Sequence, residues 1–322
     1  MALLITGAMG HVGHELVRQA SAAGVPVLAQ YHRTFRAADA AAAGEEVTWA
    51  RCDLGDPAAV DALVSAHRIE GCIHPAAVPN DRLARPAPRA TYAANVAATQ
   101  HLLEAARRQS WRRFVLVSTG SVFQRETDLS RPILEDAPPA PVTIYGTTKR
   151  CAELLTSMYR QEYGVPASSV RISWVYGPPL VPRTPDWPRG PIPYLLRAAL
   201  SGEPVRMASG GDFAASFTHV SDVAAGLLAA WRADELRHDV YHLGAGENYD
   251  TFRVAAAVRA AVPEAVVEVG PGTLPWTTYN TLRGPLAGGR LHEDAGFAPH
   301  YSLEQGVAAF AGWMRTHPEA WQ

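Results

Sequence analysis

The sequence predicts an α/β protein with a doubly wound parallel sheet and a smaller α+β region towards the C-terminus. Apolar runs of strand length alternate with stretches that carry apolar residues at helical spacing. A glycine-rich turn follows the first of these runs. Strands that alternate with helices form parallel sheets with right-handed crossovers. The runs expected as strands of this sheet are 2–6, 25–30, 47–52, 71–75, 114–118 and 168–174.

Two helical stretches and a proline-rich segment divide the rest of the chain. Residues 91–109 are rich in alanine, with apolar residues at helical spacing, and 149–163 precede the sixth strand. Prolines crowd residues 178–193, which excludes a regular helix or a central strand there. We therefore expect a first domain over 1–175 and a second region over 176–322, some of whose strands return to the main sheet. In that region we expect strands at 217–220 and 240–243, and helices at 194–201, 222–231, 252–262 and 303–315.

Composition excludes several classes of protein. The chain has 322 residues, of which 48% are hydrophobic and 19% charged, and its net charge is −2. A near-neutral chain without runs of like charge is not typical of proteins that bind nucleic acid or membrane surfaces. The three cysteines form no CxxC pair, and no apolar run approaches the length of a membrane span. We expect a cytoplasmic protein with reduced thiols and no signal peptide.

The turn after the first strand indicates a dinucleotide site. It reads TGAMGHVG over residues 6–13 and opens a helix. Gly7 would form the tight turn, Gly10 would let a pyrophosphate approach the backbone, and Gly13 would allow close packing of helix on strand. The start of the helix adds its dipole and free N–H groups. The sequence therefore predicts a Rossmann domain that binds NAD or NADP.

The end of the second strand favours NADP. An NAD site normally has an acid there for the ribose hydroxyl, but this chain has Tyr31. His32, Arg33 and Arg36 instead offer cationic groups for a 2′-phosphate, although surface arginines are common in this chain. Asp53 and the adjacent Leu54 follow the third strand, where an adenine ring is often held.

A Tyr-x-x-x-Lys pair is the main catalytic candidate. Tyr145 and Lys149 are four residues apart and lie on one face of a helix. Of the 29 lysines and arginines only Lys149 is a lysine, which marks a place where the broad guanidinium fork would not serve. A nearby ammonium would lower the pKa of the phenol, so that it can exchange a proton with a substrate oxygen. Ser118 and Thr119 end the fifth strand at the ligand-binding edge.

These motifs resemble the extended short-chain dehydrogenases/reductases of the NAD-dependent epimerase/dehydratase superfamily. The resemblance covers nearly the whole chain. It rests on TGAMGHVG at 6–13, CDL at 52–54, HPAAV at 74–78, NVAAT at 95–99, VSTGSVF at 117–123, YGTTK at 145–149, RISWVYGPP at 171–179 and FAPHYSLEQG at 297–306.

The resemblance implies a role for individual residues. The catalytic hydroxyl falls on Thr119, the base on Tyr145, the lysine on Lys149, and the helix asparagine of a water relay on Asn95. Ser173 falls beside the nicotinamide. The expected cofactor contacts are Gly7, Met9, Gly10, His11, Val12, Gly13, His32, Arg33, Asp53, Leu54, Ala76, Ala77, Tyr145, Lys149 and Ser173. The expected substrate contacts are Asn80, Gly120, Ser121, Trp174 and Tyr176.

Departures from the family pattern bear on the substrate. Gly120 and Ser121 stand where the 4,6-dehydratases carry an acid pair, which argues against elimination of water. Ala215 stands where an arginine grips the diphosphate in UDP-galactose 4-epimerase-like members. Three other arginines could compensate, although each is more often a surface residue: Arg183, Arg189 and Arg283. The short motifs around residues 118–123 and 171–177 are closer to the dTDP-4-dehydrorhamnose reductase branch.

We therefore expect an NAD(P)-dependent dehydrogenase or reductase that acts on a carbonyl or secondary alcohol of a sugar, sugar acid or similar polar small molecule. The alternative is an NAD-dependent epimerase of a sugar or sugar nucleotide. A third hypothesis is a dinucleotide sensor without catalysis. We expect no metal, because hydride transfer needs none and the histidines form no ligand pattern. The family resemblance implies a homodimer.

Overall fold

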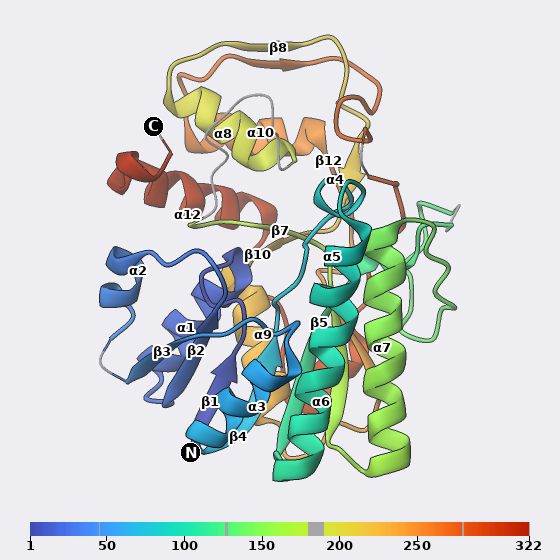
Figure 1. The fold of residues 1–322 in the computed structure, drawn as a ribbon. Helices are drawn as coiled ribbons and strands as arrows, with labels where there is room; N and C mark the ends of the chain where they lie inside the picture. Colours follow the sequence, from blue (N-terminus) through green and yellow to red (C-terminus); the bar gives the residue numbers. More distant parts are fainter. Residues whose placement is uncertain (45, 126–127, 180–189, 279, 322) are drawn as a thin grey trace.

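The computed structural model describes the whole chain except residues 45, 126–127, 180–189, 279 and 322. A seven-stranded parallel sheet has the order β11-β6-β5-β4-β1-β2-β3 (Figure 1). The order reverses between β1 and β4, which is where doubly wound sheets bind ligands. The predicted fold class is confirmed. The strands are β1 (Ala2–Ile5), β2 (Val27–Tyr31), β3 (Val47–Arg51), β4 (Ile69–His74), β5 (Arg113–Thr119), β6 (Ala167–Ile172) and β11 (Val240–Leu243).

The strands are apolar on both faces because helices cover both faces of the sheet. In β1, Leu3 and Ile5 join one buried cluster and Leu4 joins the other, as the alternation of side chains along a strand requires. The first cluster lies under α1 (His11–Ala22), α9 (Val220–Arg232) and α11 (Gly289–Ala295). The second lies under α3 (Pro57–Ala66), α6 (Ala98–Gln109) and α7 (Ile144–Tyr163).

The stretch predicted as one helix over 91–109 is divided in the structure. A helix α5 (Pro88–Tyr92) runs into a π-helical turn, η1 (Ala93–Ala97), before α6 begins. Such turns often occur at functional sites, and this one contains Asn95. The helix α7 begins at Ile144, earlier than expected, because Thr143 caps it: its hydroxyl accepts a hydrogen bond from the Gly146 N–H at 3.3 Å.

The C-terminal region packs three helices around its own core. These are α8 (Pro191–Leu200), α10 (Thr251–Ala261) and α12 (Leu303–Thr316), which lie beyond the carboxyl ends of the sheet (Figure 1). The strand β11 returns to the main sheet beside β6, as expected, and α9 and α11 also pack on the sheet. Elements that follow residue 175 in the chain therefore pack on the main sheet. The domain boundary at residue 175 stays a prediction.

Short pairs of strands and several short helices complete the fold. The strand pairs are β7 (Trp174–Tyr176) with β10 (Phe217–His219), β9 (Ala214–Ala215) with β12 (Tyr249–Asp250), and β8 (Val205–Met207) with β13 (Val267–Val269). The short helices are α2 (Ala37–Ala42), α4 (Asp81–Ala84), η2 (Gly120–Val122) and η3 (Pro318–Ala320). Over the described ranges, no helix has the length and apolar character that crossing a membrane requires.

Candidate active site

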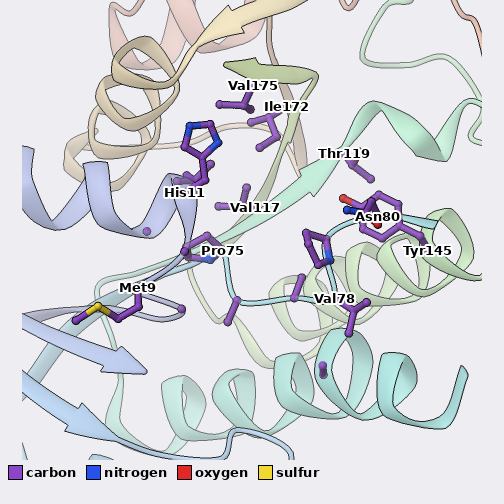
Figure 2. Close-up of a pocket in the computed structure, with 18 of the residues that line it drawn as sticks. Met9, His11, Pro75, Val78, Asn80, Val117, Thr119, Tyr145, Ile172 and Val175 are labelled. Carbon is purple, nitrogen blue, oxygen red and sulfur yellow. The ribbon is translucent and has the colours of Figure 1, made fainter. Parts of the chain in front are cut away.

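A cavity of about 1480 Å³ lies over the carboxyl ends of the parallel strands. Residues that follow β1 to β6 line it, together with the loop around residue 276. In Figure 2, Met9 lies at one end of the view, and Thr119 and Tyr145 lie at the other. The position matches the ligand crevice of a doubly wound sheet.

The glycine-rich turn has the backbone that its sequence predicts. Gly7 has a φ of +58°, and a side chain on Gly13 would collide with the Gly7 carbonyl oxygen. The side chain of Gln30, at the end of β2, holds this turn: its Oε1 accepts from the Gly7 N–H at 2.9 Å, and its Nε2 donates to the Cys52 carbonyl at 2.6 Å. Gln30 was not among the residues predicted for the site, although its position beside Tyr31 at the end of a strand indicated that it could lie near the cofactor.

The turn and the cavity fit a dinucleotide. Gly10 and His11 place the first backbone N–H groups of α1 on the cavity wall, where a pyrophosphate would meet the positive end of the helix. His11 also joins the turn to the loop after β7, because its Nε2 lies 2.8 Å from the Gly177 carbonyl oxygen. Met9, Val12, Gly13, Leu54, Ala76 and Ala77 line the same cavity.

The adenosine end is less cationic than the sequence suggested. Arg36 pairs with Asp39 and donates to the Met9 carbonyl at 2.8 Å, so its charge is already engaged. His32 Nε2 lies 3.5 Å from the Asp53 carboxylate, whose other oxygen accepts from the Gly55 N–H. Arg33 is exposed at the cavity edge. This arrangement gives a 2′-phosphate little beyond Arg33, so the preference for NADP stays an unconfirmed prediction.

Thr119 and Tyr145 meet at the other end of the cavity. Both side chains line the cavity, with Thr119 at the last residue of β5 and Tyr145 in the first turn of α7. Burial, the largest cause, raises the pKa of the phenol, and the carboxylate of Asp81 adds to the rise. The hydrogen bond with Thr119 and the charge of Arg283 act in the opposite direction. The two hydroxyls together can hold one substrate oxygen.

Lys149 lies one turn further along α7 and is buried at the cavity wall. Burial lowers its pKa to about 8 against the opposing influence of the Glu153 carboxylate. Its charge helps to lower the pKa of His74 to about 3, after the larger effect of burial. The charge of Arg283 acts to lower the pKa of Tyr145, and the expected effect of Lys149 on Tyr145 stays a prediction.

Asn95 does not line the cavity. Its Oδ1 accepts from the Val78 N–H at 2.7 Å, and its Nδ2 donates to the Val78 carbonyl and to Thr148 Oγ1 at 3.3 and 3.1 Å. It thereby fixes the loop after β4, whose residues 75–82 line the cavity, against α7. A role in a water relay stays a prediction, whereas the observed contacts are structural.

Arg283 lies at the reacting end of the cavity, against the backbone of Gly120. A Cβ built on Gly120 would lie 2.6 Å from Arg283 Nε, and Nη2 donates to Ser173 Oγ at 3.3 Å. Gly120 therefore does not reach the cavity itself, contrary to its expected role as a substrate contact, because the guanidinium covers it. Of the two other arginines suggested by the sequence, Arg183 and Arg189, nothing can be stated, since both lie outside the described residues.

Tyr176 is a second correction to the expected substrate contacts. It is buried in the C-terminal core, with its ring edge-on to Phe217 and His219 and its hydroxyl against Gly306. The other expected substrate contacts, Asn80, Ser121 and Trp174, do line the cavity, as does Ser173, which was expected beside the nicotinamide. The sequence reading missed Asp81 and Trp276, which line it as well.

Asp81 accepts hydrogen bonds at the N-terminus of α7 and forms no ion pair with the residues that the structure describes. One carboxylate oxygen accepts from the Tyr145 N–H at 3.3 Å and the other from Gln124 Nε2 at 3.4 Å. An acid at a helix N-terminus is favoured by the free N–H groups and the dipole. In the part of the chain that the structure covers, no cluster of three or more His, Cys, Asp or Glu residues could hold a metal ion.

Fold and site together define an enzyme that binds a nicotinamide dinucleotide and carries a Thr/Tyr/Lys set. The model of the NAD dependent epimerase/dehydratase family matches residues 3–244, and the chain belongs to this family. It is an NAD-dependent enzyme of the extended short-chain type. The resemblance noted in the sequence is thus confirmed for the family, but not for the reductase branch.

Three relatives illustrate the range of the family. The chain is 26% identical to dTDP-glucose 4,6-dehydratase of Xanthomonas campestris pv. campestris (strain B100), over 98% of this chain and 93% of the relative. It is 27% identical to a probable UDP-glucuronate 4-epimerase of Rhizobium meliloti (strain 1021), over 81% and 79%. The structure of the Thermus thermophilus UDP-glucose 4-epimerase in complex with NAD is similar with a TM-score of 0.82, at 25% identity, covering 98% of this chain and 99% of the other.

These relatives support the alternative hypothesis from the sequence better than the main one. They are named as epimerases and a dehydratase of nucleotide sugars, and none of the three is named as a reductase. The coarse prediction of an enzyme that transfers hydride to and from a sugar carbon is confirmed.

Proposed function

We propose that the protein is an NAD-dependent epimerase that inverts a secondary hydroxyl of a nucleotide sugar. The observation that carries this proposal is the pair of residues after Thr119. A dehydratase needs an acid there to expel water, but Gly120 is covered by the Arg283 guanidinium and Ser121 carries no charge. The nearby acid, Asp81, is bound to the N-terminus of α7. Oxidation and re-reduction of one carbon remain within reach of the residues present.

The residues of the chain have distinct tasks in such a reaction. Bound NAD supplies a hydride acceptor that can return the hydride to the same carbon. Tyr145, in its ionised form, takes the hydroxyl proton of the sugar as the carbonyl forms, and the resulting phenol gives the proton back when the hydroxyl re-forms. Thr119, which lines the cavity beside Tyr145, donates a hydrogen bond to the same oxygen. Lys149 provides a buried charge one turn from Tyr145 and a donor for the cofactor ribose.

The adenosine end supports NAD rather than NADP as the resident cofactor. Arg36 is neutralised by Asp39, and His32 faces Asp53. An epimerase that keeps one NAD through turnover needs no exchange with solution. The homodimer that the resemblance implies is part of this proposal, as are the expected substrate contacts that line the cavity, Asn80, Ser121 and Trp174.

A hydride-retention experiment tests the proposal. The purified protein is denatured and the released dinucleotide is identified by mass. The native protein is then incubated with UDP-glucose and UDP-glucuronate that carry deuterium at C4. An epimerase contains about one NAD per chain and yields the C4 epimer with the deuterium retained. Little bound dinucleotide, with deuterium transferred to added NAD or NADP, would identify the dehydrogenase that the sequence first suggested.

A matched pair of variants separates catalysis from binding. Tyr145→Phe removes the phenolic hydroxyl, and we expect epimerisation to fall by a factor of about 100 to 10,000. Tyr163→Phe removes the hydroxyl of an exposed tyrosine at the other end of α7 and should change nothing. Unchanged activity in Tyr145→Phe would instead support a sensor or a different base.

A further inference from the structure

Arg283 is fixed in place by the chain around it before any ligand arrives. Its carbonyl oxygen accepts from Asn248 Nδ2 at 2.8 Å. Three residues further on, Leu286 forms a bridge with Ile133, and a side chain on Gly284 would strike the Arg131 carbonyl. These contacts hold the segment that carries Arg283 and direct its side chain to the cavity wall. A group held in this way is preorganised for a ligand.

The guanidinium lies beside the atoms that would react. It packs on Gly120, the residue after Thr119, and reaches Ser173 with Nη2. Burial lowers the pKa of Arg283, and the electrostatic interaction with Tyr145 acts to raise it. A sugar oxygen held by Thr119 and Tyr145 would therefore have Arg283 as a neighbour.

Arg283 has no acidic partner among the residues that the structure describes. Its guanidinium makes a single side-chain hydrogen bond there, to the neutral Ser173 hydroxyl, and no carboxylate lies within ion-pair distance. Asp81 shares the cavity but is bound to the Tyr145 N–H and to Gln124. A half-buried cation without an anion is unfavourable, and an anionic ligand would relieve this.

We infer that the substrate is a uronate, and that Arg283 binds its carboxylate while Thr119 and Tyr145 act on C4. This inference rests on the proposed epimerase function. In a pyranose, C4 is bonded to C5, which carries the carboxylate of a uronate, whereas the diphosphate is attached to C1 across the ring. A cation beside the C4 oxygen is thus placed for the carboxylate. The planar fork of arginine matches both carboxylate oxygens.

Gly120 provides the space that the Arg283 guanidinium occupies. Any side chain at this position would occupy the space of the guanidinium, since its Cβ would lie 2.6, 2.8 and 3.0 Å from Arg283 Nε, Nη2 and Cζ. The same absence of a side chain removes the acid that a dehydratase uses. One residue therefore excludes water elimination and makes room for recognition of a carboxylate.

The test compares two sugars in several variants of the NAD-loaded protein. The kcat/KM for C4 epimerisation is measured with UDP-glucuronate and UDP-glucose. We expect the wild type to prefer the uronate by a factor of about 100, and Arg283→Met to reduce that preference by a similar factor. Gly120→Ala, which displaces the guanidinium without removing its charge, should reduce the preference in the same direction. Arg206→Met, at an exposed surface position, is the control that leaves both values unchanged.

Each outcome decides the inference. If Arg283→Met lowers activity on both sugars equally, the arginine binds the diphosphate and the inference is overturned. If the wild type turns over UDP-glucose at least as well as UDP-glucuronate, the inference is overturned while the epimerase proposal stands. If neither sugar is epimerised, both fall. Should Arg283→Met fail to fold, which its melting curve reveals, Arg283→Lys keeps the charge without the fork, and an unchanged preference there overturns the inference.

Discussion

Arg171 and Glu153 form a two-pronged ion pair in the interior of the protein, with Nε to Oε1 at 2.8 Å and Nη2 to Oε2 at 2.9 Å. The pair joins β6 to α7, and both side chains are at most 2% exposed. Glu153 also accepts from Ser118 Oγ at 2.6 Å, next to Thr119, and lies one helical turn after Lys149. A single carboxylate thus connects the strand end and the helix that carry the catalytic candidates.

Loss of Glu153 should destabilise the protein strongly. Glu153→Ala leaves the Arg171 guanidinium buried without its anion, and we expect a loss of about 3–5 kcal/mol in the free energy of unfolding. The measurement is urea unfolding followed by circular dichroism. Glu162→Ala, at an exposed position of the same helix, is the control. In the double variant Glu153→Met, Arg171→Met the loss should be smaller than in Glu153→Ala, because no unpaired charge remains. A loss below about 1 kcal/mol in Glu153→Ala would contradict the argument.

Lys149 should not tolerate arginine, although the rest of the chain uses arginine for its cations. The ammonium is buried, so the larger fork must displace its neighbours. We expect epimerisation to fall by about 100-fold or more in Lys149→Arg. Burial lowers the pKa of Lys149 to about 8. Wild-type activity should therefore decline as the pH rises above about 8, and the residual activity of Lys149→Arg should lack this decline. The same alkaline decline in both proteins would assign it to another group.

The cofactor preference can be tested at the ion pair that engages Arg36. We expect the protein to bind NAD at least about tenfold more tightly than NADP, because Asp39 neutralises Arg36 at the adenosine end. Asp39→Asn removes that anion and should raise the affinity for NADP by about tenfold while leaving NAD within about twofold. Arg33→Gln should weaken NADP binding alone. Isothermal titration of the cofactor-depleted protein measures all of these affinities, and a wild type that prefers NADP would restore the original interpretation of the sequence.

The features of the site that a short motif determines could be predicted from the sequence. The conformation of Gly7 and the close approach at Gly13 follow from one turn between a strand and a helix. Thr119 and Tyr145 come together because a strand end and a helix start meet at the same edge of a parallel sheet. The alternation of strands and helices likewise indicated the parallel, doubly wound sheet.

Long-range placement was not readable in the same way. Arg283 is one of many arginines in the chain, and it lies in an irregular segment. Its position depends on the hydrogen bond from Asn248 to its carbonyl and on the bridge between Leu286 and Ile133. Tyr176 follows Trp174 by two residues on β7, so a shared role was a fair expectation; packing against Phe217 and Gly306 instead buries it. The π-helical turn around Asn95 has an alanine-rich sequence that is typical of an ordinary helix.

Two buried histidines should make the protein sensitive to acid. Burial is the main reason that the pKa values of His74 and His242 are lowered to about 3; the charges of Lys149 and Arg171, respectively, add to the effect. In the unfolded chain both titrate near their ordinary value of about 6.5. The unfolded state therefore binds more protons between about pH 6.5 and 3, and stability falls as the pH is lowered through this range. Integration gives a loss of about 2 kcal/mol per histidine in the free energy of unfolding between neutral pH and pH 5.

Urea unfolding at a series of pH values should show this loss. His242→Asn should reduce the slope of stability against pH, whereas His300→Gln, at an exposed position, should not. A stability that does not change between about pH 7 and 5 would contradict this argument, because it would mean that both rings bind protons in the fold at their ordinary pKa of about 6.5.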